Sequence, residues 1–249
     1  MFFIKRIRNF LKQKEQDLLK IPDEYVNVAY SYRKDWVEKK AKTLKRGANI
    51  LDVGAGPCQY KPLFKHCHYT SQDFMQYRGN KKGLLADKWN YGKIDIISDI
   101  AKIPVKDKSY DAILCTEVLE HVPYPIEAIK EMARILKPGG KLWITAPFAS
   151  GLHQEPYHFY GGYSPYFYKL FSQKFDLKIK EIQPTGGFFK HLAQELWRAG
   201  DILEKRKKIH IVSKILFKKT LPLFFAKLDK TIYIKEFTIG YLIEAEKLK

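Results

Sequence analysis

Cysteine is scarce in this sequence: only three occur among 249 residues, at Cys58, Cys67 and Cys115. An odd number without paired spacing argues against a disulfide framework and against a cysteine-rich zinc site. No apolar run approaches the roughly 20 residues that a membrane-spanning helix needs. Basic residues interrupt the apolar N-terminus, so the continuous core of a signal peptide is missing. These absences predict a cytoplasmic protein with reduced thiols, and they give no reason to expect a bound metal.

Acidic residues are also few, since 27 Asp and Glu stand against 45 Lys and Arg, for a net charge of +18. Such an excess suggests an anionic partner: nucleic acid, an acidic lipid surface or an anionic substrate. A solvated basic surface without a partner is the alternative. The length suits one α/β domain with additions, and the 45% hydrophobic content suffices for a core.

The first 46 residues predict N-terminal helices. Apolar residues recur at helical spacing near the start, with basic residues between them: Phe3, Ile7, Phe10, Leu11 and Lys5, Arg6, Arg8, Lys12. This pattern suits a short helix lying on an anionic membrane, or one packing its apolar stripe on its own domain. A second helix is expected over residues 24–46, ahead of the first strand.

Residues 50–57 contain a short apolar run with one acid, Asp52, that ends at Gly54 and Gly56. The run predicts a buried strand, and the glycines predict the turn that leaves it. Glycine permits positive φ and lets a ligand approach the backbone. We expect a helix to open over residues 57–64, with its N-terminus aimed at the ligand. This unit is a candidate small-molecule site.

Strand and helix patterns alternate along the rest of the chain, which predicts a parallel sheet with right-handed crossovers. The expected strands are 49–53, 69–74, 94–98, 110–115, 141–146 and 177–183. The expected helices are 125–136 and 164–171, a turn is expected over 137–140, and a loop over 76–93.

Two nucleoside cofactors compete for the glycine loop. A dinucleotide fingerprint needs a third glycine or alanine, but Gln59 occupies that position. A carboxylate at Asp52 would repel a pyrophosphate but can serve a cationic amino group. Asp73 lies 17 residues past Gly56, where an acid at the end of a second strand can accept hydrogen bonds from ribose hydroxyls. These features favour S-adenosylmethionine over NAD.

Several motifs then occur in order: Asp52-Val53-Gly54-Ala55-Gly56-Pro57, Asp73, Asp99-Ile100, Tyr110-Asp111-Ala112-Ile113-Leu114, Glu117-Val118-Leu119-Glu120-His121-Val122 and Leu136-Lys137-Pro138-Gly139-Gly140. Over residues 48–185 this set resembles the class I S-adenosylmethionine-dependent methyltransferases, in the small-molecule branch. The resemblance implies a doubly wound, Rossmann-like α/β fold with a seven-stranded sheet whose last strand is antiparallel, here near residues 237–244. It also implies the domain limits 47–187 and 236–249.

The resemblance further implies the cofactor contacts. Gly54 and Gly56 would lie under the methionine part, and Asp52 would hold its amino group. Asp73 would bind the ribose, with Phe74 beside the adenine. The remaining implied contacts are Asp99 and Ile100 at the adenine, and Cys115, Thr116 and Glu117 near the sulfonium.

The loop over residues 147–160 follows the fifth strand and is rich in histidine and aromatic residues. In doubly wound sheets this edge carries ligands, so the loop should hold the methyl acceptor. His153 is the first candidate for a general base, followed by His158 and Tyr157; packing roles are the alternative for each. This segment resembles methyltransferases linked to bacterial polysaccharide and cell-surface glycan synthesis, which implies a sugar or lipid-linked sugar acceptor.

Glu117, Glu120 and His121 have the i, i+3, i+4 spacing of one helix face. They resemble a cluster in ubiquinone-pathway O-methyltransferases, where a divalent cation is a possible partner, although we expect no metal here. The Asn/Asp-Pro-Pro-Tyr motif of DNA and RNA amino-methyltransferases is missing after the fourth strand, which argues against a nucleic-acid substrate despite the positive charge.

Residues 188–235 form an expected basic helical insertion ahead of the last strand. Its basic run at 205–208, with apolar residues nearby, suits docking on an anionic membrane. A cap-like helix pair with a basic outer face, at a dimer interface, is the alternative. The overall prediction is a methyltransferase that O-methylates a small molecule, sugar or lipid-linked sugar. An RNA or protein methyltransferase and a non-catalytic cofactor-binding protein are the alternatives.

Overall fold

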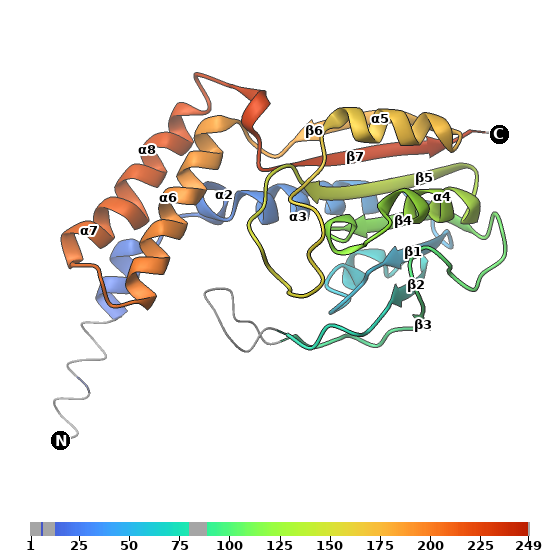
Figure 1. Cartoon of the computed structure of the whole chain (residues 1–249), viewed down its shortest axis with the longest axis horizontal. Helices are drawn as coiled ribbons and strands as arrows, with labels where there is room; N and C mark the ends of the chain where they lie inside the picture. The colour runs from blue at the N-terminus through green and yellow to red at the C-terminus, as the bar shows by residue number, and fades with distance from the viewer. Residues whose placement is uncertain (1–5, 7–12, 80–88, 249) are drawn as a thin grey trace. The chain divides into compact units, whose positions relative to one another are not determined.

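A computed structural model describes residues 6, 13–79 and 89–248, and it forms two compact units. One unit contains Arg33–Thr185 and Ile239–Lys249, and the other contains Met1–Tyr32 and Gly186–Thr238. Figure 1 shows the sheet of the first unit and the helices of the second. The amphipathic N-terminal segment with Phe3, Ile7, Phe10 and Leu11 falls outside the described residues.

The first unit contains a seven-stranded sheet in the order β3-β2-β1-β4-β5-β7-β6 (Figure 1). Its strands are β1 (Asn49–Val53), β2 (His68–Asp73), β3 (Ile96–Ile97), β4 (Tyr110–Thr116), β5 (Leu136–Pro147), β6 (Leu177–Pro184) and β7 (Gly240–Lys247). β7 runs antiparallel to both of its neighbours, β5 and β6, and the other pairings are parallel. The doubly wound, Rossmann-like sheet with an antiparallel last strand is therefore confirmed.

Helices cover both faces of this sheet. α4 (Pro125–Ile135) and α5 (Pro165–Lys174) pack on the face to which Leu51, Ile113 and Ile243 point, and together they form the main apolar core. Side chains alternate along a strand, so Glu244 points to the opposite face. There Lys40 of α3 (Val28–Ala41) pairs with Glu244 and, at 2.6 Å, with Glu181 of β6.

Strands β1 and β4 cross the centre of the sheet, so their side chains are buried on both faces. All but the first residue of β1 are buried, as are five of the seven residues of β4. This double burial explains why both strands are visible in the sequence as apolar runs. The strand order reverses direction between β1 and β4, and the carboxyl end of β1 therefore lies at the edge where such sheets bind ligands.

Several sequence expectations differ in detail from the structure. The helix expected over 57–64 is a four-residue 3₁₀ helix, Lys61–Phe64, because the 14 residues between β1 and β2 include three with positive φ, Gly54, Gly56 and Cys58. The strand expected over 94–98 contains two residues. The turn at 137–140 is a bulge within β5, between the pairs Tyr110–Leu136 and Ala112–Lys141. The N-terminal helix expected over 24–46 is split into α2 (Asp23–Val26) and α3.

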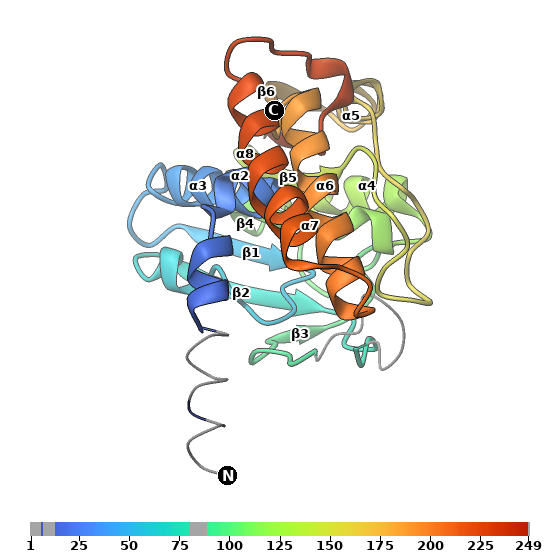
Figure 2. The same cartoon turned by 90° about the vertical axis from the view of Figure 1, so that its left-hand side faces the viewer.

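The second unit is helical. α6 (Phe188–Lys205) and α8 (Leu221–Leu228) lie side by side, joined through α7 (Ile211–Ile215) and a π-helical turn, Leu216–Thr220 (Figure 2). The Asp229 carboxylate accepts hydrogen bonds from the backbone N–H groups of Gly187, Phe189 and Lys190, at 3.0 to 3.2 Å. It therefore satisfies the free donors at the start of α6, where a negative charge also complements the helix dipole. None of the helices in the described part of the chain has the length and apolar character of a membrane span.

Candidate functional site

A cavity of about 600 Å³ lies at the carboxyl ends of the first four strands, entirely within the first unit. Its walls come from the loops after β1, β2, β3 and β4 and from one segment of the loop after β5. Eight of the nine predicted cofactor-binding residues line it: Asp52, Gly54, Asp73, Phe74, Asp99, Ile100, Thr116 and Glu117. Residues as far apart in the chain as Asp52 and Phe159, 107 positions, therefore meet at one cavity.

The glycine loop forms the floor of this cavity with two residues of positive φ, Gly54 at 66° and Gly56 at 49°. A Cβ on Gly54 would lie 2.5 Å from Val118 Cγ2, and one on Gly56 would lie 2.7 Å from the Trp89 ring. Both conformation and space therefore require glycine. Gly56 does not itself line the cavity, but its N–H donates to Asp73 Oδ2 at 2.9 Å. This bond ties the loop after β1 to the end of β2.

Asp52 and Asp73 are buried acids at the ends of neighbouring strands. Burial raises the pKa of Asp52 to about 7. The hydrogen bond that Asp52 accepts from the Tyr69 hydroxyl, at 2.5 Å, lowers this pKa but does not offset the effect of burial. Burial also raises the pKa of Asp73, although the backbone N–H groups of Met75 and Gly56 donate to its carboxylate. The cavity thus contains two carboxylates whose ionised forms would be stabilised by a nearby cation or by hydroxyl hydrogen-bond donors.

Aromatic and apolar groups line the far side of the cavity. Phe74 packs edge-to-face on Tyr157, with ring centroids 5.1 Å apart. Asp99 accepts a hydrogen bond from the N–H of Ala101 at 2.8 Å, and Ile100 beside it is buried. A flat ring can enter here between apolar side chains, with a carboxylate at its edge.

Glu117 is held by a partly buried arginine, Arg33, that the sequence did not indicate. Its Oε1 accepts a hydrogen bond from Thr145 Oγ1 at 2.7 Å and lies 3.1 Å from Arg33 Nη1. Arg33 also donates through Nε to the Tyr60 hydroxyl at 3.0 Å, and the Glu117 charge raises the pKa of this guanidinium, against the opposing effect of its burial. Nothing in α3 distinguishes Arg33 from the other basic residues of that helix, because its partners lie far away in the chain.

The predicted helix face of Glu117, Glu120 and His121 is wrong. The 3₁₀ turn begins only at Leu119, and Glu117 precedes it with a φ of 53°. Glu117 thus lies outside the turn that holds the other two residues, and its carboxylate pairs with Arg33. Cys115, which the resemblance placed near the sulfonium, is fully buried and is not part of the cavity lining.

Three histidine rings gather beside the cavity. The His121 ring lies 4.8 Å from that of His153 and 5.8 Å from that of His158, and the last two lie 4.6 Å apart. His121 and Tyr157 line the cavity, whereas His153 and His158 do not. Burial lowers the pKa of His121 to about 4, so its ring is neutral at pH 7. The base assignments to His153, His158 and Tyr157 stay predictions.

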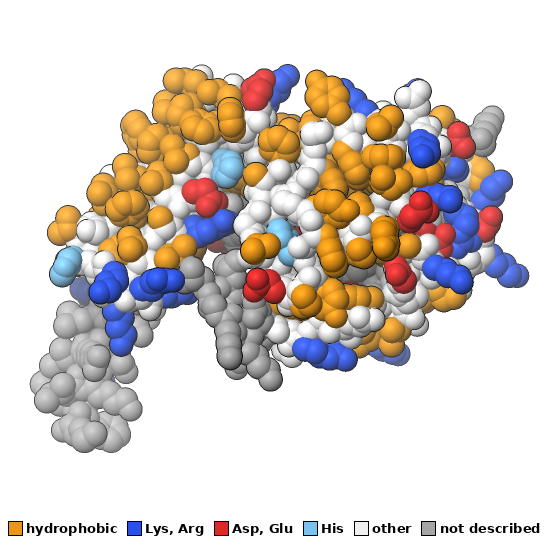
Figure 3. All heavy atoms as spheres, viewed as in Figure 1, with side chains coloured by type: hydrophobic (Ala, Val, Ile, Leu, Met, Phe, Trp, Pro, Cys, Tyr) orange, Lys and Arg blue, Asp and Glu red, His pale blue; other side chains and the backbone are white. Residues whose placement is uncertain are grey.

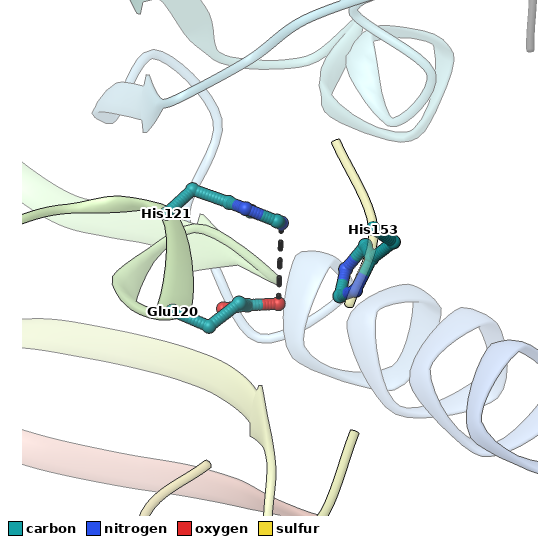
Figure 4. A group of neighbouring side chains, drawn as sticks. All are labelled: Glu120, His121 and His153. Carbon is teal, nitrogen blue, oxygen red and sulfur yellow. Dashed lines mark ion pairs between the residues drawn. The ribbon is translucent and has the colours of Figure 1, made fainter. Parts of the chain in front are cut away.

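His121 contacts a fully buried carboxylate. Its Nε2 lies 3.7 Å from Glu120 Oε1, and its Nδ1 lies 2.6 Å from the Tyr157 carbonyl oxygen. Burial raises the pKa of Glu120 well above its ordinary value. Figure 4 shows the side chains of Glu120, His121 and His153 pointing toward one another.

Comparisons with known proteins agree with this architecture. Residues 51–144 match the family described as "Methyltransferase domain". The chain is 32% identical over 102 residues to the sterol 24-C-methyltransferase of Gibberella zeae, covering 39% of this chain and 27% of that protein. It is 29% identical over 133 residues to the ubiquinone biosynthesis O-methyltransferase of Xylella fastidiosa, covering 50% of this chain and 51% of that protein. The chain thus spans about half or less of these relatives.

Among solved structures, a putative sarcosine dimethylglycine methyltransferase from Galdieria sulphuraria superposes with a TM-score of 0.55 and 18% identity. The match covers 86% of this chain and 84% of that one. At this identity the likeness establishes the fold, which is that of Rossmann-like methyltransferases.

Proposed function

We propose that this chain is an S-adenosylmethionine-dependent methyltransferase and that the cavity binds the methyl donor. One observation carries the proposal: Asp52, Asp73 and Asp99, from the ends of three strands, line one cavity. Their order matches the polar groups of the cofactor, with Asp52 for the ammonium, Asp73 for the ribose hydroxyls and Asp99 for the adenine amino group. The match of residues 51–144 to a methyltransferase domain supports the same assignment.

Methyl transfer requires no covalent bond between the protein and either substrate. When bound, S-adenosylmethionine would supply an activated methyl group, which an acceptor atom would displace from the sulfonium sulfur while the electron pair of the broken bond stayed on sulfur. The chain aligns the acceptor and excludes water. If the acceptor is a hydroxyl, a neutral histidine beside the cavity can take its proton.

Incubation with the labelled methyl donor tests the activity. The wild-type chain should transfer labelled methyl to a fraction of a bacterial lysate. Asp73→Asn should abolish this transfer when the donor concentration is high enough to saturate the wild type but too low to saturate the variant. Separation of the product into lipid, small-molecule, RNA and protein fractions identifies the acceptor class. Label in RNA or protein would favour the alternative substrates, and cofactor binding without any transfer would indicate a non-catalytic binding protein.

We propose a small-molecule acceptor, and within that class a sugar or lipid-linked sugar. The loop over 150–160 supports this idea, because Tyr157 and Phe159 place aromatic rings at the cavity, where they can stack on a sugar face. The curated relatives named above are named for ubiquinone biosynthesis and for a sterol, both of which are small apolar molecules.

A peripheral contact with an anionic membrane would bring such a lipid-linked acceptor within reach. In the helical unit, several large apolar side chains are exposed, and Figure 3 shows apolar side chains gathered over α8. Those of residues 186–238 are Ile211, Val212, Leu216, Phe224, Ile232, Tyr233 and Phe237. Residues 205–208, all of them basic and exposed, lie in the same unit and can pair with acidic headgroups.

Charge reversal tests the membrane contact. The combined variant Lys205→Glu, Arg206→Glu, Lys207→Glu and Lys208→Glu should weaken the affinity for anionic liposomes roughly 1000-fold or more, because each basic residue near such a surface contributes about 1 kcal/mol. Matched reversal of four exposed lysines of the sheet unit, Lys65, Lys102, Lys106 and Lys108, is the control. Equal effects of both variants would assign the binding to net charge alone, and a change in oligomeric state without a change in pelleting would favour a dimer interface.

A further inference from the structure

A buried carboxylate without a partner stands beside the cavity. Glu120 is fully buried, and neither of its side-chain oxygens has a hydrogen-bond partner among the described residues. The Nε2 atom of His121 is also buried without a hydrogen-bond partner in that part of the chain. Buried carboxylates in proteins are normally paired, hydrogen-bonded or bound to a metal ion, so two unsatisfied groups 3.7 Å apart indicate a missing partner between them.

The histidines on either side are oriented as metal-binding histidines are. His121 directs Nδ1 at the carbonyl oxygen of Tyr157, at 2.6 Å, and His153 directs Nδ1 at that of Gly151, at 2.9 Å. A carbonyl oxygen only accepts, so both Nδ1 atoms carry the proton and both Nε2 atoms keep a free lone pair. Donation of the other ring N–H to a backbone carbonyl is the usual arrangement around a metal-bound histidine.

We propose that Glu120, His121 and His153 bind a divalent transition-metal ion at the inner wall of the cavity. One donor atom of each residue lies within 4.8 Å of the other two, and Figure 4 shows the three side chains converging. An ion bound at roughly 2.1 Å would need donor atoms about 3.5 Å apart. Binding would therefore require the side chains to move inward, and His153, which is partly exposed, has the most freedom to do so.

The donor set determines the class of ion. Two imidazoles and one carboxylate suit Zn²⁺, Co²⁺, Mn²⁺ or Fe²⁺, whereas Mg²⁺ and Ca²⁺ prefer oxygen ligands only. Three protein ligands leave at least one position open, as in catalytic zinc sites. Since His121 lines the cavity, that position lies within reach of an acceptor bound there.

Neighbouring groups are already engaged and do not complete the set. Glu117, the third member of the cluster that the sequence spacing indicated, is held by Thr145 and Arg33. His158 is 3.2 Å from the Ser150 hydroxyl through its Nε2, the atom that would otherwise be free. The chain thus offers His158 as a matched control, since its ring lies 4.6 Å from that of His153.

Cobalt titration of the whole chain, prepared without an affinity tag and stripped with a chelator, tests the site directly. One equivalent of Co²⁺ should produce visible ligand-field absorption that Zn²⁺ displaces. His153→Ala should weaken Co²⁺ binding roughly 100-fold or more, because it removes one of three ligands. The isosteric Glu120→Gln should also weaken it, and His158→Ala should change it by less than about twofold.

Several results would overturn the proposal. They are the absence of saturable Co²⁺ binding by the wild-type chain, equal binding by His153→Ala and wild type, and thiolate-to-metal charge-transfer bands that assign the ion to the free cysteines. Circular dichroism of each variant separates loss of ligands from loss of fold. The readout is spectroscopic, so the outcome does not depend on methyl transfer, and a failure of the proposed function would leave it intact.

Discussion

The buried carboxylate of Asp52 predicts a specific pH dependence of cofactor binding. Its pKa is about 7 in the free protein, because burial raises it more than the Tyr69 hydrogen bond lowers it. The cationic amino group of S-adenosylmethionine favours the ionised form, so the pKa falls on binding. Binding must therefore strengthen as the pH rises toward 7 and weaken as it falls through 7.

The magnitude follows from the ionised fraction. With a pKa near 7, about 9% of Asp52 is ionised at pH 6 and about 76% at pH 7.5. If only the ionised form binds well, the apparent dissociation constant is roughly eightfold higher at pH 6. An α-amino group with a pKa of about 7.7 to 8.0 stays mostly charged over this range, so the ligand adds little.

Isothermal titration calorimetry at pH 6, 6.5, 7 and 7.5 measures this dependence. Asp52→Asn should bind about 10- to 100-fold more weakly at pH 7.5, with a flat profile, because a charge-assisted bond is lost. Tyr69→Phe should keep the profile but move its midpoint upward, since it removes the donor that lowers the pKa. A dissociation constant of the wild type that is constant within about twofold from pH 6 to 7.5 would refute the reasoning.

Three further predictions concern the cavity and the sheet. Asp73→Ala should weaken S-adenosylmethionine binding by about tenfold or more in calorimetry, since its carboxylate serves the ribose; an unchanged dissociation constant would refute that role. Gly54→Ala should abolish cofactor binding while circular dichroism stays native, because its Cβ would lie 2.5 Å from a methyl group of Val118 and its φ is 66°; normal binding would contradict the close approach. Lys40→Met should lower the free energy of unfolding by about 2 kcal/mol in urea, because it leaves two partly buried glutamates unpaired. The exposed Lys42→Met should cost under about 0.5 kcal/mol, and equal losses in the two variants would show that burial of the Lys40 pairs adds nothing.

The sequence predicted those strands and helices whose burial produces a simple pattern of apolar residues within a short segment. β1 and β4 are visible as apolar runs because both of their faces are buried. α4 is visible because its apolar residues recur on one side, which faces the core. Asp52 and Asp73 were found because each lies at the end of a strand, at the edge where a doubly wound sheet binds ligands, whereas Asp99 was indicated only by the family resemblance.

The missed features depend on contacts between distant residues. Arg33 lies 84 positions from Glu117, and no local signal connects them. The helix expected after Gly56 was wrong because the return to β2 is short and takes positive φ values, which a regular α-helix cannot accommodate. His153 was chosen for its position in a loop, but only the folded chain shows that it lies beside His121 and Glu120.

A titration of the wild-type chain with S-adenosylmethionine and, separately, with NAD tests the central claim most directly. The acid-lined cavity predicts saturable binding of one equivalent of S-adenosylmethionine at pH 7.5 and no binding of NAD, whose pyrophosphate meets the carboxylates of Asp52 and Asp73. The account would be contradicted by the absence of S-adenosylmethionine binding, or by NAD binding at least as tightly.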